Sequence, residues 1–308
     1  MSRARDLADS ADKDIVGTIT VDGLTVAGNV SADGGTIKLD GNYPTGTDNV
    51  ALGNTALDDG SLSGGYNTAV GAGSLSANTS GQQNASLGAY SLDANTTGSY
   101  NAGFGQSSLG SNTTGSNNTG LGRGALSANT TASNNTAVGY ASGDAITTGA
   151  ENAVFGSNAA SGLTVGQKNT ALGAYALRND TQGSSSVAIG HQALNAQNFT
   201  SATSTYNVAV GANAGAAITT GQYNNLIGGL AGDALTDGSA NVAIGYGALS
   251  SDTRGQSSVA IGHAALESQN FTSSTDSFNT AVGKSAGNKV TTGTNNTLIG
   301  GQAGYSNT

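Results

Sequence analysis

Apolar and polar residues follow one another with a fixed short period from Asn49 to the end of the chain. An Asn-Thr-Ala-(Val/Ile/Leu/Phe)-Gly motif, or a close variant of it, occurs fifteen times. Its copies begin at residues 49, 67, 84, 101, 118, 135, 152, 169, 186, 207, 224, 241, 258, 279 and 296. Eleven of the fourteen intervals are 17 residues long, one is 18 and two are 21. This regularity predicts identical supersecondary units stacked in one dimension.

Each repeat, numbered from its Asn as position 1, contains two short apolar runs separated by polar, glycine-bearing turns. Positions 2 to 4 predict a strand that ends at the Gly of position 5, which is present in all fifteen copies. Positions 8 and 9, often Ala-Leu, predict a second short strand. Glycine at this density costs about 1 kcal/mol per site in a helix, so a helical array is excluded. The predicted fold class is all-β, a parallel β-roll or β-helix solenoid of about 15 coils and roughly 70 Å in length.

The residues at positions 9 and 12 change together, and this identifies the interior of the coil. Where position 9 is Leu, position 12 is polar, as in Leu75/Asn78, Leu92/Asn95, Leu126/Asn129, Leu177/Asp180 and Leu249/Asp252. Where position 9 is Gly or Ala, position 12 is apolar, as in Gly143/Ile146, Ala160/Leu163, Gly215/Ile218, Gly232/Leu235 and Gly287/Val290. Two coil subtypes are therefore expected to fill a similar volume from different backbone positions, as close packing requires.

Position 3 is small in most copies, and alternation along a strand places it opposite positions 2 and 4. If the large apolar residue of position 4 lies in the core, position 3 faces outward. Ala69, Ala137, Ala209 and Ala281 are then candidates for close contact with another chain, as the interface of a homotrimer. A flat face exposed to solvent is the alternative interpretation.

The two 21-residue repeats carry four extra residues at the same place, inside a block of residues 169–240 that recurs at 241–308. Insertions in solenoids fall in loops on one face, which is often the binding face. Phe199, Tyr206, Phe271 and Phe278 are the candidate receptor-contact residues, because aromatic faces beside Asn, Gln and Thr suit saccharides. In the alternative interpretation, each inserted Phe folds back and caps its own coil.

Three other columns of the repeat have structural interpretations. The Asn of position 1 is expected to form a stacked amide ladder that satisfies backbone groups of the turns. The Gly of position 5 indicates positive φ or a close approach of two chain segments. His191 and His263 occupy the variable position 6, which we expect to face solvent rather than a metal ion.

Composition excludes several classes of function. Only 9% of the residues are charged and the net charge is −9, so the surface has no basic stripe for nucleic acid. No apolar run approaches the roughly 20 residues of a membrane helix, so membrane insertion is not expected. The chain has no Cys, and its acidic residues show neither a paired-carboxylate spacing nor the motif of calcium β-rolls. We therefore expect no enzymatic activity, no cofactor and no metal.

Composition divides the chain into three segments. Residues 1–14 are charged and predict an N-terminal anchor, residues 15–48 predict an irregular β connector, and residues 49–308 form the repetitive array. Residues 1–14 also lack the apolar core of an export signal, so export by the Sec route is not expected.

The repeat element resembles the head repeat of trimeric autotransporter adhesins of the YadA type. Residues 186–190 and 258–262 both read Ser-Val-Ala-Ile-Gly, the form usual in that family, and the resemblance covers residues 49–308. It implies a left-handed parallel β-roll in a side-by-side homotrimer. The chain departs from the family in its longer period, and it shows no coiled-coil stalk and no membrane-anchoring barrel.

The longer polar turns, as in residues 129–139, resemble fibre or appendage proteins of marine bacteriophages. Residues 1–7 followed by residues 17–26 are similar to the N-termini of such virion proteins. This resemblance implies a structural virion fibre that assembles in the host cytoplasm, where no export signal is needed. The fibre would be held to a tail or capsid protein through residues 1–48 and attached to a host cell-surface glycan or protein. A bacterial adhesin head, located on the cell surface, is the alternative. Rows of Thr at positions 13 and 14 give an ice-binding solenoid as a third, less favoured interpretation.

Overall fold

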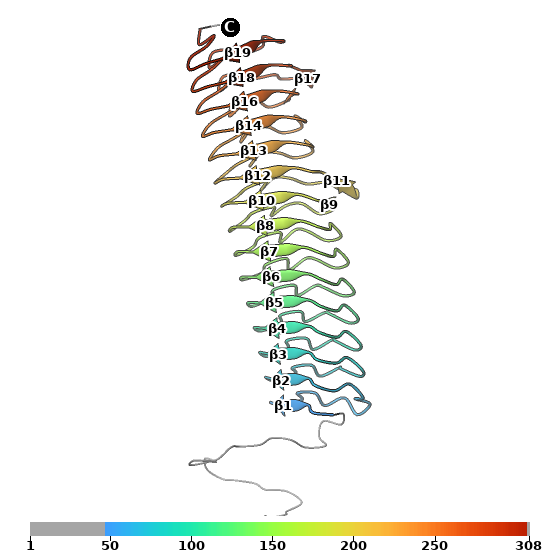
Figure 1. Cartoon of the computed structure of the whole chain (residues 1–308). Helices are drawn as coiled ribbons and strands as arrows, with labels where there is room; N and C mark the ends of the chain where they lie inside the picture. The colour runs from blue at the N-terminus through green and yellow to red at the C-terminus, as the bar shows by residue number, and fades with distance from the viewer. Residues whose placement is uncertain (1–46, 307–308) are drawn as a thin grey trace, which may run out of the picture. The chain divides into compact units, whose positions relative to one another are not determined.

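The computed structural model of the protein describes residues 47–306. The predicted anchor, and nearly all of the predicted connector, lie outside these residues. Residues 47–306 contain no helix, and therefore no helix that is long and apolar enough to cross a membrane. A parallel sheet of fifteen strands, one from each repeat, runs along the whole stack (Figure 1). The predicted all-β solenoid of about 15 coils is confirmed.

Each strand of the main sheet spans positions 2 to 4 and pairs in parallel with the strand of the next coil, position against position. The strands are β1 (Val50–Leu52), β2 (Thr68–Val70), β3 (Ala85–Leu87), β4 (Ala102–Phe104), β5 (Thr119–Leu121), β6 (Thr136–Val138), β7 (Ala153–Phe155), β8 (Thr170–Leu172), β10 (Val187–Ile189), β12 (Val208–Val210), β13 (Asn225–Ile227), β14 (Val242–Ile244), β16 (Val259–Ile261), β18 (Thr280–Val282) and β19 (Thr297–Ile299). The inserted residues add two short parallel pairs, which are β9 (Gly183–Ser184) with β11 (Thr203–Ser204) and β15 (Gly255–Gln256) with β17 (Thr275–Asp276).

Positions 8 and 9 do not form the predicted second strand. Instead, the backbone turns sharply there, and positions 7 and 9 take positive φ, as at Tyr90 (56°) and Leu92 (51°). Such a conformation costs an L-residue about 1 kcal/mol. It also turns the Leu side chain into the interior, where it is fully buried. Burying a Leu gains about 1.5–3 kcal/mol, which exceeds the backbone cost and explains why Leu recurs at position 9.

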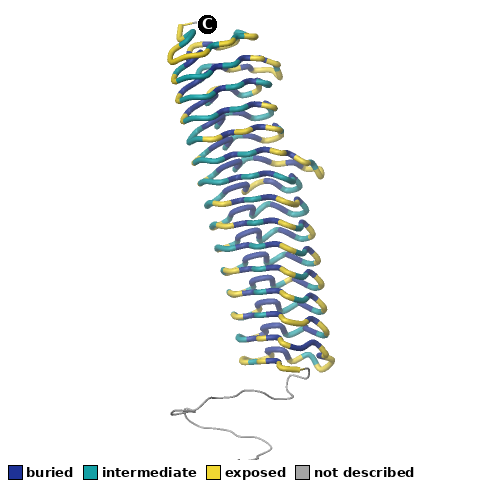
Figure 2. The backbone as a smooth tube through the Cα atoms, in the orientation of Figure 1, coloured by how far each residue is buried: buried dark blue, intermediate teal, exposed yellow. Residues whose placement is uncertain are grey.

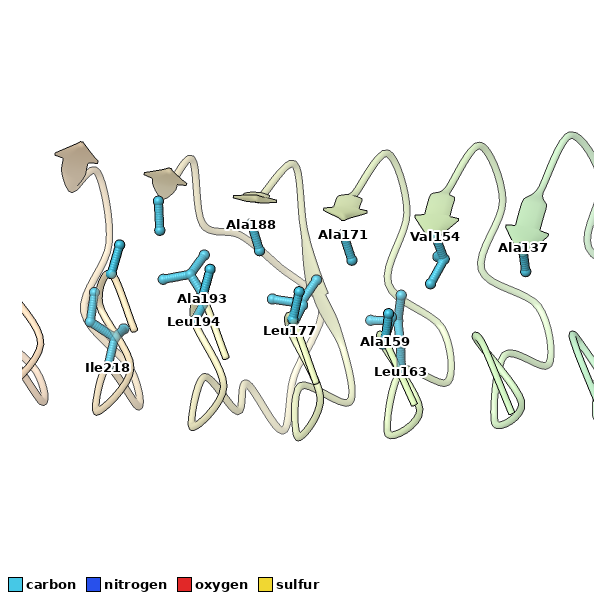
Figure 3. Packing of buried hydrophobic residues seen from close by; sticks show 14 of the residues in the cluster. Ala137, Val154, Ala159, Leu163, Ala171, Leu177, Ala188, Ala193, Leu194 and Ile218 are labelled. Atoms are coloured by element: carbon cyan, nitrogen blue, oxygen red, sulfur yellow. The ribbon is translucent and has the colours of Figure 1, made fainter. Parts of the chain in front are cut away.

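Position 3 points into the interior and position 4 points outward, opposite to the prediction. Figure 3 shows Ala137, Val154 and Ala171 projecting from their strands toward residues of the facing wall such as Leu163 and Leu177. The four alanines proposed as a trimer interface are completely buried inside their own chain: Ala69, Ala137, Ala209 and Ala281. That assignment is wrong because position 3 faces the narrow interior, which is filled from the facing wall by Leu at position 9 or by Ile, Leu or Val at position 12.

A coil with a large residue at position 3 shows the same limit on interior volume, because the residues that face it at position 9 are small. Position 3 of β13 is Leu226, which is fully buried. The residues at position 9 nearest to it are Gly215 and Gly232, where an added Cβ would lie 2.7 and 2.8 Å from Leu226. Volume is therefore exchanged across the narrow interior, from the strand to the facing wall.

The predicted exchange between positions 9 and 12 is confirmed. Leu75 and Asn78 are both fully buried, and so is Ile146, the position 12 residue of the other subtype. In that coil an added Cβ on Gly143 would lie 2.9 Å from Ile146 Cδ1, so Ile146 occupies space that a position 9 side chain would need. Gly143 also takes the positive φ (58°) without the cost that Leu incurs.

The Gly of position 5 meets both predicted requirements, positive φ and close approach. Gly139 has φ 132°, and an added Cβ would lie 2.7 Å from the carbonyl carbon and oxygen of Gly156 in the next coil. Buried and exposed residues recur at the same places from coil to coil (Figure 2).

Candidate functional site: the outer sheet face and the inserted coils

The sheet presents an uncharged outer surface made by positions 2 and 4, which we call the outer sheet face. Position 2 is Thr, Val or Ala in every coil except one, which has Asn225, and none of these residues is buried. Position 4 is apolar in every coil, and none of its residues is buried: Leu52, Val70, Leu87, Phe104, Leu121, Val138, Phe155, Leu172, Ile189, Val210, Ile227, Ile244, Ile261, Val282 and Ile299.

This exposure is unusual for a parallel sheet. Leu52 is 54% exposed and Leu87 is 52% exposed. All-parallel sheets almost always have both faces covered, and a contiguous apolar patch of this extent marks an interaction surface. This face was not predicted from the sequence, because a large apolar residue that recurs with a fixed period is expected in the core. The glycines at position 9 opposite Leu226 are the signal in the sequence that could have corrected it.

The predicted amide ladder at position 1 is confirmed. Each buried Asn joins its neighbours along the stack: the Asn84 backbone N–H donates to Asn67 Oδ1 (3.0 Å), and Asn84 Nδ2 donates to the Gly98 carbonyl (2.9 Å). The same pair of bonds recurs at Asn118 and Asn135. The ladder satisfies buried turn groups, which would each cost 1–3 kcal/mol if left unpaired.

Position 12 carries a second ladder in the coils with Leu at position 9. Asn95 Nδ2 donates to Asn78 Oδ1 (2.8 Å) and to the Gly98 carbonyl (3.0 Å), and Asn112 and Asn129 continue the row. Sequence analysis predicted only that this position is polar. The row explains why a polar residue can be fully buried there.

At each insertion, a buried carboxylate replaces this amide ladder, and it belongs to the coil before the inserted one. Asp180 Oδ1 accepts from the backbone N–H of Gly183 (3.0 Å) and from that of Phe199 (3.1 Å). Asp180 Oδ2 accepts from Gln197 Nε2 (2.6 Å), and Gln197 Oε1 accepts from Asn207 Nδ2 (2.9 Å). This network ties the inserted residues to the interior of the coil.

Two of the four candidate receptor residues are not available to a receptor. Phe199 and Phe271 are each only 6% exposed, so the fold-back interpretation is correct and their assignment as contact residues is wrong. The reason is that the backbone N–H of each Phe is held by the buried Asp of the preceding coil. Tyr206 and Phe278 are exposed, as predicted.

Tyr206 lies beside a shallow hollow at the first insertion (protruding at β9 and β11 in Figure 1). Its ring stacks on Tyr223 of the next coil, with centroids 5.8 Å apart and planes at 15°. The hollow has a volume of about 310 Å³, and Lys168 and Thr203 also line it. The structure thus brings Tyr206 to a polar hollow but separates it from the Phe of its own loop.

The remaining candidate columns are explained structurally. His191 and His263 are exposed, as predicted, and each contacts a Tyr of the preceding coil, with ring centroids 6.1 Å and 5.7 Å apart. No group of three or more His, Cys, Asp or Glu side chains in residues 47–306 could hold a metal ion. Within the Thr rows, the position 13 hydroxyl donates to the backbone carbonyl of the next coil, as from Thr96 to Thr113 (3.0 Å).

Three carboxylates at position 10 lie in a partly buried environment. Burial raises the pKa of Asp93, Asp144 and Asp233, and backbone N–H groups beside each carboxylate oppose this shift. Each of these carboxylates lacks an ion-pair partner within residues 47–306, where Arg254 and Asp237 form the one salt bridge (3.5 Å).

Comparison with family models, with curated proteins and with solved structures finds no match to this chain.

Proposed function

We propose that the protein is a structural fibre of a bacteriophage particle, in which three left-handed rods associate side by side and attach to a host-surface saccharide. The outer sheet face carries this proposal. It runs the length of fifteen coils and is uncharged and apolar at every position 4, while a parallel sheet needs cover on both faces. A second and a third copy of the same rod offer a face of matching length and composition, as symmetric oligomers require.

The virion assignment rests on the resemblance of the polar turns and of residues 1–26 to phage fibre and appendage proteins. In this proposal residues 1–48 bind a tail or capsid protein. Immunoelectron microscopy of phage particles, with antibody raised against residues 49–308, tests it. We expect label on projections of roughly 70 Å, the length of fifteen coils at 4.8 Å each. Particles without label, from cultures that express the protein, would contradict the assignment.

A bacterial trimeric adhesin head is the second candidate, and the two Ser-Val-Ala-Ile-Gly copies favour it. The same antibody separates the two functions, because an adhesin would label the envelope of uninfected cells. Ice binding is less favoured still. In five of the six Thr-Thr pairs at positions 13 and 14, the position 13 hydroxyl donates to a backbone carbonyl, as at Thr113 and Thr130, so these pairs do not form a free two-wide array.

A further inference from the structure

A groove crosses four coils on the corner of the rod that follows position 5. Two hollows, of about 430 Å³ and about 260 Å³, share Ser107 and Ser127 and therefore form one continuous groove. Small residues at positions 7 and 10, such as Gly124 and Gly110, create this depression in the row of larger side chains. The groove lies outside the inserted coils and outside the outer sheet face.

An aromatic ring lies at each end of the groove. Tyr90 is 53% exposed and Tyr140 is 51% exposed, and they line the first and second hollow. Tyr90 rests against Gly73 of the preceding coil, where an added Cβ would lie 2.9 Å from its Cδ1. The two rings belong to coils three steps apart, which is roughly 14 Å along the axis at 4.8 Å per coil.

Arg123 presents its guanidinium to the groove in a fixed position. Its Nε donates to Gln106 Oε1 (3.2 Å), and its Nη1 donates to Tyr140 Oη (3.4 Å). The guanidinium also lies over the Tyr140 ring, 5.7 Å from the centroid. An arginine has five N–H donors, so donors remain for a ligand after these two bonds.

The walls of the groove supply hydrogen-bond acceptors. Asp93 lines the first hollow and Asp144 the second, and neither forms an ion pair with Arg123. Ser107 and Ser127 add hydroxyls that both donate and accept. The side chains thus offer acceptors, donors and ring faces together, with one positive and two negative charges. A ligand rich in neutral hydroxyl groups fits this set, whereas an acidic ligand meets a net negative wall.

We propose that this groove binds a neutral oligosaccharide lying along the rod axis. One sugar packs on Tyr90, Arg123 donates to sugar oxygens, and Asp93 and Asp144 accept from sugar hydroxyls. The inference rests on the proposed attachment function and moves the site from the inserted loops to the coils that begin at residues 84, 101, 118 and 135.

The test is binding of the full chain to an array of neutral hexasaccharides of glucose, galactose, mannose and rhamnose, printed beside uronic-acid hexasaccharides. The groove variant is Tyr90→Ala/Arg123→Ala. The matched control is Tyr246→Ala/Arg178→Ala, which removes an equally exposed Tyr and an Arg that also lies over a tyrosine ring (5.1 Å) outside the groove. Both variants change surface side chains, and circular dichroism confirms that they fold.

We expect the wild-type protein to bind at least one neutral hexasaccharide. The groove variant should lose about tenfold or more in affinity, and the control should change by less than about twofold. Equal binding by the groove variant, or binding only to uronic-acid sugars, would overturn the inference. So would the absence of sugar binding by a protein that still labels bacterial cells, and this outcome leaves the attachment function standing. Loss of both cell and sugar binding would count against the attachment function as well.

Discussion

The plain stretch of coils and the insertions differ in how the buried residue at position 12 is satisfied. In the plain coils, Asn95 Nδ2 donates to Asn78 Oδ1, and Asn112 Nδ2 donates to Asn95 Oδ1. Each side-chain amide in this row both donates and accepts hydrogen bonds. In the coil before the first insertion, Asp180 accepts three N–H groups and donates none. The extra residues bring the Phe199 N–H into the interior, and a carboxylate has enough lone pairs to satisfy it.

The second insertion repeats this arrangement in detail. Asp252 Oδ1 accepts from the N–H of Gly255 (2.9 Å) and of Phe271 (3.0 Å), and its Oδ2 accepts from Gln269 Nε2 (2.6 Å). The buried Asp, the Gln one coil later and the inserted Phe therefore behave as one unit. The duplicated block supplies an internal control for every substitution in that unit.

Both kinds of coil share the Gly of position 5, and replacing it is expected to have the largest effect. Gly139→Ala in a plain coil and Gly190→Ala in an inserted coil should each lower the free energy of unfolding by about 3 kcal/mol or more, because the new Cβ would meet the next backbone. Gly124→Ala has positive φ (69°) but open space, so it should cost only about 1 kcal/mol. Urea unfolding measures all three, and equal losses would contradict the account.

Exchanging the position 12 residues between a plain coil and the coil before an insertion should be nearly as damaging. Asn95→Asp places a buried carboxylate against two acceptors, Asn78 Oδ1 and the Gly98 carbonyl, and should cost about 3 kcal/mol at neutral pH. Asp180→Asn points an N–H₂ group at bound donors and should cost about 2 kcal/mol.

Amide hydrogen exchange shows where in the coil the Asp180→Asn substitution acts. Asp180→Asn should accelerate exchange of the Phe199 amide and leave the Phe271 amide protected. The matched variant Asp252→Asn should do the reverse. If neither amide responds, the carboxylates do not anchor the insertions.

Converting one interior subtype into the other sharpens the comparison of positions 9 and 12. Gly143→Leu alone should overpack against Ile146, and Ile146→Asn alone should leave a void, each at about 2 kcal/mol. The double variant rebuilds the Leu/Asn pair, so its cost should fall below the sum of the two by at least about 1 kcal/mol. Additive losses in thermal unfolding would show that the two positions do not share a volume.

The smallest effect concerns a carboxylate that lacks the donors of Asp180. Burial raises the pKa of Asp144, so the folded state of the wild type holds this proton more tightly and loses stability as pH rises from 3.8 through the raised value. Asp144→Asn removes this dependence. Its melting temperature should slightly exceed that of the wild type at pH 7, and the gap should close below pH 3.8. A gap that widens toward low pH would contradict the stated direction.

Comparing one repeat with another predicted more of the fold than the residue type at any single position did. The period, the Gly of position 5, the Asn ladder and the exchange between positions 9 and 12 all follow from comparing one repeat with another. Alternation predicted that positions 3 and 4 face opposite ways, but not which of them faces inward. That choice depends on the width of the interior, which Leu226 and its facing glycines reveal only together.

Two other features needed the structure. Leu rarely adopts positive φ, so an Ala-Leu pair does not predict the sharp turn found at Leu92. The burial of Phe199 depends on its N–H reaching Asp180, nineteen residues earlier in the chain. The groove at Tyr90 arises from small residues in the three coils that follow it, and a search for single aromatic insertions does not find it.

Mass in solution tests most directly whether the outer sheet face joins three chains. Light scattering of the full chain should give three times its mass of 29.8 kDa. The variant Leu121→Glu/Phe155→Glu, at position 4, should fold and give 29.8 kDa, while the control Thr114→Glu/Thr148→Glu, at the exposed position 14, should stay trimeric. A wild-type mass of 29.8 kDa, or a trimer undisturbed by glutamates at position 4, would contradict the account.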